Sequence, residues 1–271
     1  MKKHLSVAMV AVRSILAPLV GVLLALAAAE GAMLLLSLRI FGGQRLELVL
    51  GAAGAAFWYR AALLVLALLL RFRNQGLENT IDHLRISEWT ATLWWGLCFT
   101  AAYVILWAVQ VGLLLGGSAY VLSQTPELAA SPQAVFLASW RYGFFHALLP
   151  LDQWTGYLRQ IAVCLSAGMS CASWAFWQRR DQSGEQRAID LALWWRKLRI
   201  DGVGWLNLGL ALVLLDYKSL GGFSLATFTQ KWGPLSESSV ADLLVTFGLL
   251  LLTLLSVLSV RREVKNHEAR L

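Results

Sequence analysis

The sequence predicts an all-α, polytopic membrane protein with about six transmembrane helices and additional interfacial amphipathic helices. Composition and apolar run length support this fold class. Of the 271 residues, 58% are hydrophobic and only 14% are charged, whereas about a quarter of the residues in a soluble domain carry charge. Several apolar runs approach or exceed the roughly 20 residues with which a helix crosses a bilayer. The alternating segments of about ten residues that mark a membrane β-barrel are absent from the sequence.

Six apolar segments are expected to span the membrane, all within one transmembrane domain that covers residues 1–271. The fifth segment is the shortest, because Asp216 and Lys218 follow it closely; the alternative interpretation is a broken helix that continues beyond them. Helix boundaries read from apolar patterns carry an error of a few residues. The expected spans are 15–38, 48–70, 90–116, 155–177, 202–215 and 240–260.

Lysine and arginine are distributed unevenly between the segments that connect these spans. With the N-terminus inside, most of the 23 basic residues fall in the N-terminal segment, the two inner connections and the C-terminal tail. Cytoplasmic segments carry such an excess, so we expect both termini to be cytoplasmic. The net charge of +7 is explained in this way without a nucleic-acid partner. Tryptophans favour membrane boundaries, and of the 13 only Trp107 lies in the middle of a span.

The N-terminal segment 2–14, "KKHLSVAMVAVRS", combines basic residues with a small apolar stretch. This pattern is typical of a helix that lies in the headgroup layer, and we expect the chain to turn into the first span near Pro18. In the alternative interpretation, the first span simply begins earlier.

The inner segment 74–89, within "RFRNQGLENTIDHLRISEW", has the pattern of a short amphipathic helix. Apolar residues at spacings of four and three define one helical face, and charged residues occupy the other side. Three arginines balance three acidic residues between Arg71 and Trp89. A helix that only binds anionic lipid would be mostly basic, so this balance favours docking on a protein. The apolar face consists of Leu77, Ile81 and Leu84, and the charged residues are Glu78, Asp82, Arg85 and Glu88.

Two further segments outside the spans are apolar or amphipathic. Residues 131–150 on the outer side are rich in aromatic side chains and predict either a re-entrant or interfacial helix or a surface helix. Residues 185–201 on the inner side combine an apolar face with a basic end, which is typical of a helix on the lipid surface.

Ionisable residues inside spans are costly and therefore suggest function. Glu30, Arg60 and Arg159 are expected at similar depths in the outer halves of their spans. An ion pair of Glu30 with Arg60 or Arg159 would satisfy both partners, either to fix helix packing or to line a translocation path. Gln110 and Asn207 are expected to form hydrogen bonds between helices.

Signatures of catalysis and of bound metals or cofactors are missing from the sequence. It contains no Walker A, HExxH or GxSxG motif. The three cysteines lie in apolar runs without a ligand pattern. We therefore assign no catalytic, cofactor or metal residues, and transport against a gradient would take its energy from another chain.

The layout resembles the permease subunits of bacterial ABC exporters that are encoded separately from their ATPase. The features that carry the resemblance are the six spans, the cytoplasmic termini, the segment 2–14 and the amphipathic segment between spans two and three. The resemblance implies that residues 77–88 form the coupling helix that docks on the ATPase, which binds the ATP. It also implies a bacterial inner-membrane location and a dimer with a second permease copy or a homologous permease. The substrate would be a lipid, a peptide or a drug-like molecule.

One feature departs from that family, and other functions remain open. The longest outer loop here lies between spans three and four, whereas many such permeases enlarge the loop between spans five and six. The main alternative is a non-transporting scaffold or regulatory subunit that docks a soluble partner. A membrane enzyme that acts on lipids would need clustered ionisable groups at one interface, and Asp82, His83 and Glu88 come nearest to such a cluster.

Overall fold

The computed structural model describes residues 2–41, 49–50, 54–73, 86–124, 132–140, 143–151, 154–182, 209 and 237–268. These residues are almost entirely helical and include no strand, which confirms the all-α fold class. The helices are α1 (Lys2–Phe41), α3 (Ala55–Arg73), α5 (Glu88–Ser123), α6 (Pro132–Trp140), α7 (Gly143–Leu148), α8 (Trp154–Gln182) and α11 (Glu237–Glu268).

Three of these helices are long and apolar enough to cross a membrane, so the chain is a membrane protein. They are the segments His4–Ile40 of α1, Glu88–Ser123 of α5 and Asp242–Lys265 of α11. The second expected span corresponds to α3, whose apolar part, Ala55–Leu70, is shorter. The fourth corresponds to α8, and the fifth lies outside the described residues apart from Gly209. The number of spans stays a prediction.

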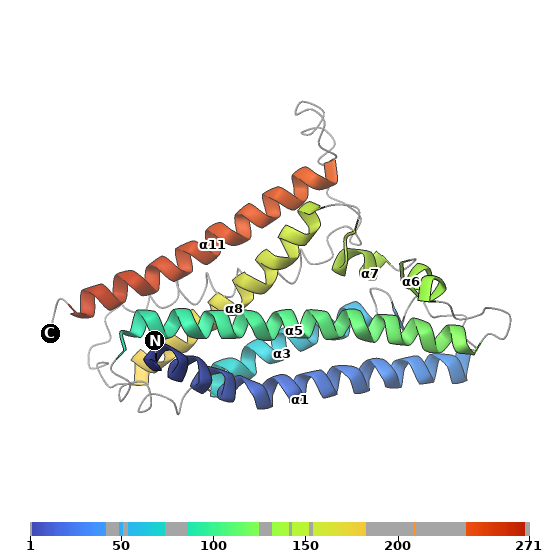
Figure 1. Ribbon diagram of the computed structural model, residues 1–271, viewed down its shortest axis with the longest axis horizontal. Coiled ribbons are helices and arrows are strands. Elements are labelled where there is room, and N and C mark those ends of the chain that lie inside the picture. The colour runs from blue at the N-terminus through green and yellow to red at the C-terminus, as the bar shows by residue number, and fades with distance from the viewer. Residues whose placement is uncertain are drawn as a thin grey trace.

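Figure 1 shows how the long helices are arranged. Helices α1 and α5 lie alongside each other and run in the same direction, while α3 runs back in the opposite direction. Helix α8 packs most extensively against α5 and next most against α11. Helix α8 therefore connects the α1–α3–α5 group to α11.

Helix α1 shows which surfaces face protein and which face outward. One stripe of apolar residues packs into the core, and a second stripe on the opposite side is exposed. Exposed leucines would be unfavourable in water but carry no such penalty against lipid tails, so the exposed stripe is suited to contact lipid. The buried stripe is Val7, Ala11, Ile15, Leu19, Val22 and Leu26; the exposed one is Leu5, Met9, Val12, Leu16, Val20 and Leu24.

Residues 2–14 belong to the same uninterrupted helix as the first span. Pro18 lies inside this helix, and because proline cannot donate a backbone hydrogen bond it favours a kink. Figure 1 shows α1 bending between its N-terminal part and the longer remainder. Its 40 residues extend about 60 Å, roughly twice the thickness of the hydrocarbon layer. Helix α1 is therefore long enough for part of it to extend beyond that layer. The headgroup location of residues 2–14 stays a prediction.

One end of the bundle gathers the N-terminus of α1, the end of α3, the start of α5 and the C-terminal ends of α8 and α11 (Figure 1). Contacts between side chains support this placement. Trp94 Nε1 donates a hydrogen bond to His4 Nδ1 at 3.2 Å, and the Arg261 guanidinium lies 5.8 Å from the centre of the Trp89 ring. We call this the basic end, because its helix termini contain Lys2, Lys3, Arg71, Arg73, Arg179, Arg180, Arg261, Arg262 and Lys265.

The aromatic segment 131–150 forms the two short helices α6 and α7, within its described residues. Their rings pack on one another: Phe136 stacks on Trp140 with 5.5 Å between centroids, and Phe145 meets Phe136 edge to face. A groove on the surface of α6 is lined by Pro132, Gln133, Phe136 and Leu137. Re-entry of this segment into the membrane stays a prediction.

Candidate functional site

The buried face of α11 is unusually polar for a helix of this hydropathy. Buried residues recur every three or four positions, and four of the first five are polar. The exposed positions between them are occupied mainly by leucine. Helix α11 therefore places polar side chains against protein and apolar side chains outward. The buried stripe is Asp242, Thr246, Leu249, Thr253, Ser256, Val260 and Val264.

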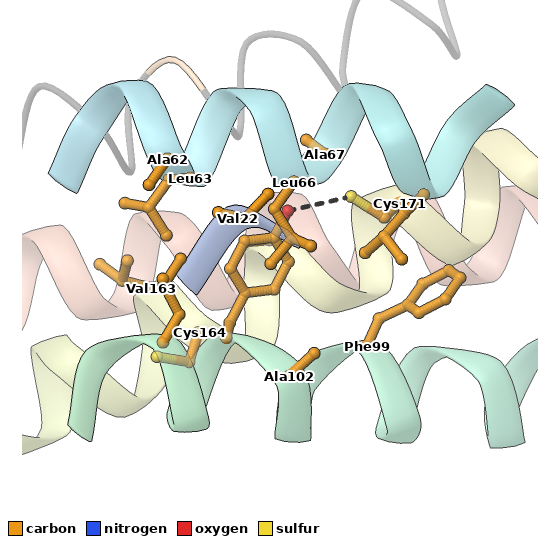
Figure 2. Close-up of a cluster of buried hydrophobic side chains, with 14 of the residues drawn as sticks. Val22, Ala62, Leu63, Leu66, Ala67, Phe99, Ala102, Val163, Cys164 and Cys171 are labelled. Atoms are coloured by element: carbon orange, nitrogen blue, oxygen red, sulfur yellow. Dashed lines mark hydrogen bonds between the residues drawn. The ribbon is translucent and has the colours of Figure 1, made fainter. Parts of the chain in front are cut away.

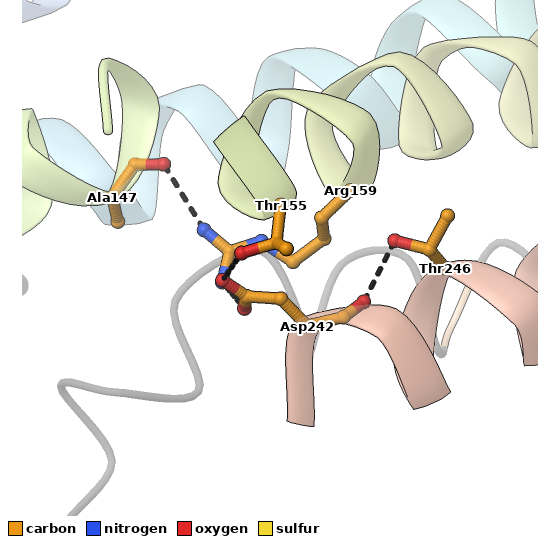
Figure 3. A network of polar contacts seen from close by, with 5 residues as sticks. All are labelled: Ala147, Thr155, Arg159, Asp242 and Thr246. Carbon is orange, nitrogen blue, oxygen red and sulfur yellow. Dashed lines mark hydrogen bonds and ion pairs between the residues drawn. The ribbon is translucent and has the colours of Figure 1, made fainter. Parts of the chain in front are cut away.

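An ion pair between α8 and α11 is the centre of this polar contact (Figure 3). Arg159 Nη1 donates to Asp242 Oδ1 at 2.6 Å, and the two side chains are 2% and 0% exposed. The Thr155 hydroxyl lies 3.5 Å from Asp242 Oδ2. Two opposite charges removed from water are tolerated when they pair and hydrogen-bond well, and this geometry meets both conditions.

Arg159 also contacts the C-terminal end of α7. Arg159 Nη2 donates to the Ala147 carbonyl at 3.2 Å, and Trp107 Nε1 donates to the Leu148 carbonyl at 3.0 Å. The last carbonyls of a helix lack partners within it and carry partial negative charge. The guanidinium therefore holds three elements together, namely α7, α8 and α11.

Farther along the same interface, Ser256 Oγ of α11 donates to Ser173 Oγ of α8 at 3.1 Å. Such hydrogen bonds stabilise helix association in lipid, where burial of apolar surface drives it little. Together with the ion pair, this contact gives the α8–α11 interface two polar links, which lie 14 residues apart along each helix.

The opposite side of α8 packs closely on α5. A Cβ atom on Gly168 would lie 2.4 Å from the Thr100 backbone nitrogen, and one on Gly96 would lie 2.3 Å from Met169 Sδ. Thr100 follows Gly96 by four positions, and Ala172 follows Gly168 by four positions. Small residues at this spacing allow helix backbones to approach each other closely in membranes. These residues therefore fix the α5–α8 crossing.

Figure 2 shows the core where α3, α5 and α8 meet. Most of its side chains are apolar, and they include Leu63, Phe99 and Val163. The Tyr103 hydroxyl and Cys171 Sγ lie 3.4 Å apart. None of the three cysteines, all of which the structure describes, forms a disulfide, so this contact is a hydrogen bond in a packed core.

A second polar contact links α1 to α5. Gln110 Nε2 donates to Glu30 Oε1 at 2.8 Å, which confirms that Gln110 forms a hydrogen bond between helices. The expected ion pair between Glu30 and Arg159 is wrong, because Arg159 pairs with Asp242. Arg60 on α3 lies at about the same depth as Glu30 on α1. Trp58, two residues before Arg60, donates from Nε1 to Sδ of Met33, three residues after Glu30, at 2.7 Å. Within the described residues, however, the partner of Glu30 is Gln110.

Most of the predicted coupling segment lies outside the described residues. This applies to Leu77, Glu78, Ile81, Asp82, Leu84 and Arg85, and also to Asn207. Glu88 is described, and it is the first residue of α5 rather than part of a separate segment. Ser87 caps α5, since its hydroxyl accepts a hydrogen bond from the Thr90 backbone nitrogen at 3.3 Å.

Sequence reasoning did not single out Asp242, the carboxylate of the ion pair. Its position inside the expected span 240–260 was an available signal, because ionisable residues in spans are rare. A second signal was the recurrence of Asp242, Thr246, Thr253 and Ser256 on one helical face.

In comparisons with known proteins, the chain matches no family, no curated protein and no solved structure.

Proposed function

We propose that the chain is the membrane-spanning permease subunit of an ATP-driven ABC exporter that works with a separate ATPase subunit. The observation that carries the proposal is the position of the α3–α5 connection. Helix α3 ends at Arg73 and α5 begins at Glu88, both at the basic end. A docking segment between these helices would lie beside the N-terminus and the ends of α8 and α11. Movement of an ATPase at this end would therefore act on five helices together, namely α1, α3, α5, α8 and α11.

The orientation and the assembly belong to the same proposal. The basic end carries the excess of Lys and Arg that is typical of the cytoplasmic side, so the ATPase would bind there from the cytoplasm of a bacterial cell. Two permease copies would form the transport unit in the inner membrane. The substrate would be hydrophobic or amphipathic, such as a lipid, a peptide or a drug-like molecule.

The second candidate is a non-transporting scaffold or regulatory subunit, and the buried ion pair favours it. Arg159 and Asp242 are sealed between helices, whereas charges that line an open path would contact water. A scaffold would use the same basic end to dock a soluble partner.

Co-purification from native membranes tests the permease proposal. We expect tagged wild-type protein to recover a stoichiometric ATPase with Walker motifs, identified by mass spectrometry. Leu84→Asp should abolish this recovery, because it places a charge on the predicted apolar docking face. Asn79→Asp is the matched control, since it adds the same charge to the opposite face of the same segment and should retain the ATPase. Undiminished recovery with Leu84→Asp would contradict the docking assignment, and a stoichiometric partner without Walker motifs would favour the scaffold.

A further inference from the structure

The carboxyl group of Glu30 has an unusual partner for an ionisable group in a membrane helix. It is half-buried at the α1–α5 interface and accepts a hydrogen bond from the neutral amide of Gln110. Asp242 offers a direct contrast, because its carboxylate meets the Arg159 guanidinium. A charged carboxylate in an apolar interface is costly unless a cation or several donors compensate it. Of the two carboxyl groups, Glu30 therefore gains more from being neutral.

The hydrogen-bonding capacity of Gln110 points to the same conclusion. Gln110 is 0% exposed, and within the described part of the chain its Oε1 has no hydrogen-bond donor. A carboxylate can only accept, whereas a protonated carboxylic acid also donates one hydrogen bond. Protonation of Glu30 on Oε2 would supply a donor to Gln110 Oε1, while Nε2 continues to donate to Glu30 Oε1. Because buried polar atoms are nearly always hydrogen-bonded, the pair is complete only when Glu30 carries the proton.

Apart from Arg60, the charged or titratable groups of the helices that pack on α1 contact other residues or lie at a different level from Glu30. Helices α3 and α5 pack most extensively against α1. On α5, the Tyr103 hydroxyl faces Cys171, and Tyr120 lies more than two turns beyond Gln110. On α3, Tyr59 packs against Phe144. Arg60 lies nearest in level to Glu30, and the hydrogen bond to Glu30 comes from Gln110. The remaining ionisable groups of these helices lie at least nine residues along the helix from Glu30, Arg60 or Gln110. They are Lys2, Lys3, His4, Arg13 and Arg39 on α1, Arg71 and Arg73 on α3, and Glu88 and Cys98 on α5.

We propose that Glu30 is a proton-binding site that controls the contact between α1 and α5. With the proton bound, Glu30 and Gln110 form a neutral pair with two hydrogen bonds. Release of the proton leaves a negative charge in the interface and removes the donor to Gln110 Oε1, so the contact loosens or admits water. This site is independent of the permease proposal, because it requires neither an ATPase nor a transported substrate.

Carbodiimide labelling of the purified, full-length protein in detergent tests the site. Dicyclohexylcarbodiimide reacts with a protonated carboxyl group in an apolar environment: the acid adds across one C=N bond, and the adduct rearranges to a stable N-acylurea. We expect label on the peptide that contains Glu30 and none on the peptide that contains Asp242, which serves as an internal control. Glu30→Gln should lose the label while circular dichroism remains unchanged. Label on Asp242 with none on Glu30 would overturn the proposal.

Infrared difference spectroscopy gives a second readout that does not depend on reagent access. Raising the pH of the wild-type protein should remove the carbonyl stretching band of a protonated carboxylic acid, and Glu30→Gln should lack this change. Gln110→Leu should shift the band to higher frequency, because the amide no longer hydrogen-bonds the acid. Coincident pH-difference spectra for wild type and Glu30→Gln would overturn the proposal, whatever the labelling shows.

Discussion

Replacement of Asp242 by alanine would remove the carboxylate from the α8–α11 interface and leave the Arg159 side chain in place. Arg159 is 1% exposed and cannot reach bulk water without moving helices apart. It also cannot be neutralised by losing its proton, because the guanidinium remains charged in proteins. The variant must therefore bury a positive charge that has lost its carboxylate partner but keeps the hydrogen bond to the Ala147 carbonyl.

The expected loss is about 3–5 kcal/mol of unfolding free energy, which is typical when one partner of a buried ion pair is removed. An ordinary hydrogen bond between membrane helices contributes far less, about 0.6 kcal/mol on average. The larger value applies here because the 2.6 Å contact joins two charges that are both almost fully buried. Thr246→Val is the matched control in the same helix. Its hydroxyl donates to the Asp242 backbone carbonyl at 2.7 Å, so its removal should cost about 1 kcal/mol or less.

Equilibrium unfolding in mixed micelles, followed by circular dichroism, measures these differences. The double variant Arg159→Met/Asp242→Leu distinguishes the loss of the ion pair itself from the cost of leaving one charge buried without its partner. Replacing both partners of a buried pair by apolar residues is often nearly neutral, so the double variant should recover most of the loss. An Asp242→Ala loss no larger than that of Thr246→Val would refute this reasoning, since it would show that Arg159 does not depend on Asp242.

Two further predictions concern the α5–α8 crossing and the basic end. Gly168→Ala should lower stability by about 1–3 kcal/mol, because the new Cβ would lie 2.4 Å from the Thr100 backbone and overpacking outweighs the gain in helix propensity. Gly112→Ala, where a Cβ meets nothing within 4 Å, should leave the unfolding midpoint unchanged or raise it. Arg261→Gln should weaken the cation–π contact with Trp89 by about 0.5–1 kcal/mol. Hydrogen exchange of the last turns of α11 should then accelerate a few-fold, and unchanged exchange would show that the contact does not hold this helix end.

Features that depend on long apolar runs could be predicted from the sequence. The expected spans at 90–116 and 240–260 lie inside α5 and α11, because a run of this length has few alternatives to a membrane helix. The interhelix role of Gln110 was also predictable, since a buried amide needs a partner. The continuity of α1 through Pro18 could not be predicted, because a proline permits either a kink or a break in a helix. Packing against neighbouring helices decides between the two.

The pairing of charges could not be predicted because it depends on which helix faces meet. Depth alone made Glu30 and Arg159 plausible partners. In the structure, α1 presents Glu30 to α5, whereas α8 presents Arg159 to α7 and α11. A carboxylate and a guanidinium at the same depth but on different interfaces cannot form an ion pair. Placing Arg159 therefore required knowledge of the neighbours of α8, which the order of helices along the chain does not provide.

The distribution of polar residues on α11 explains why such neighbours are hard to infer in a membrane protein. In a soluble helix, the apolar stripe marks the buried face. In α11 the exposed face is leucine-rich, and the buried face carries Asp242, Thr246, Thr253 and Ser256. Lipid solvates apolar side chains as well as a protein core does, so polar contacts and close packing decide which helices associate. The residues that identify the partner of a helix are thus its few polar ones, and for α11 the most specific is the carboxylate that meets Arg159.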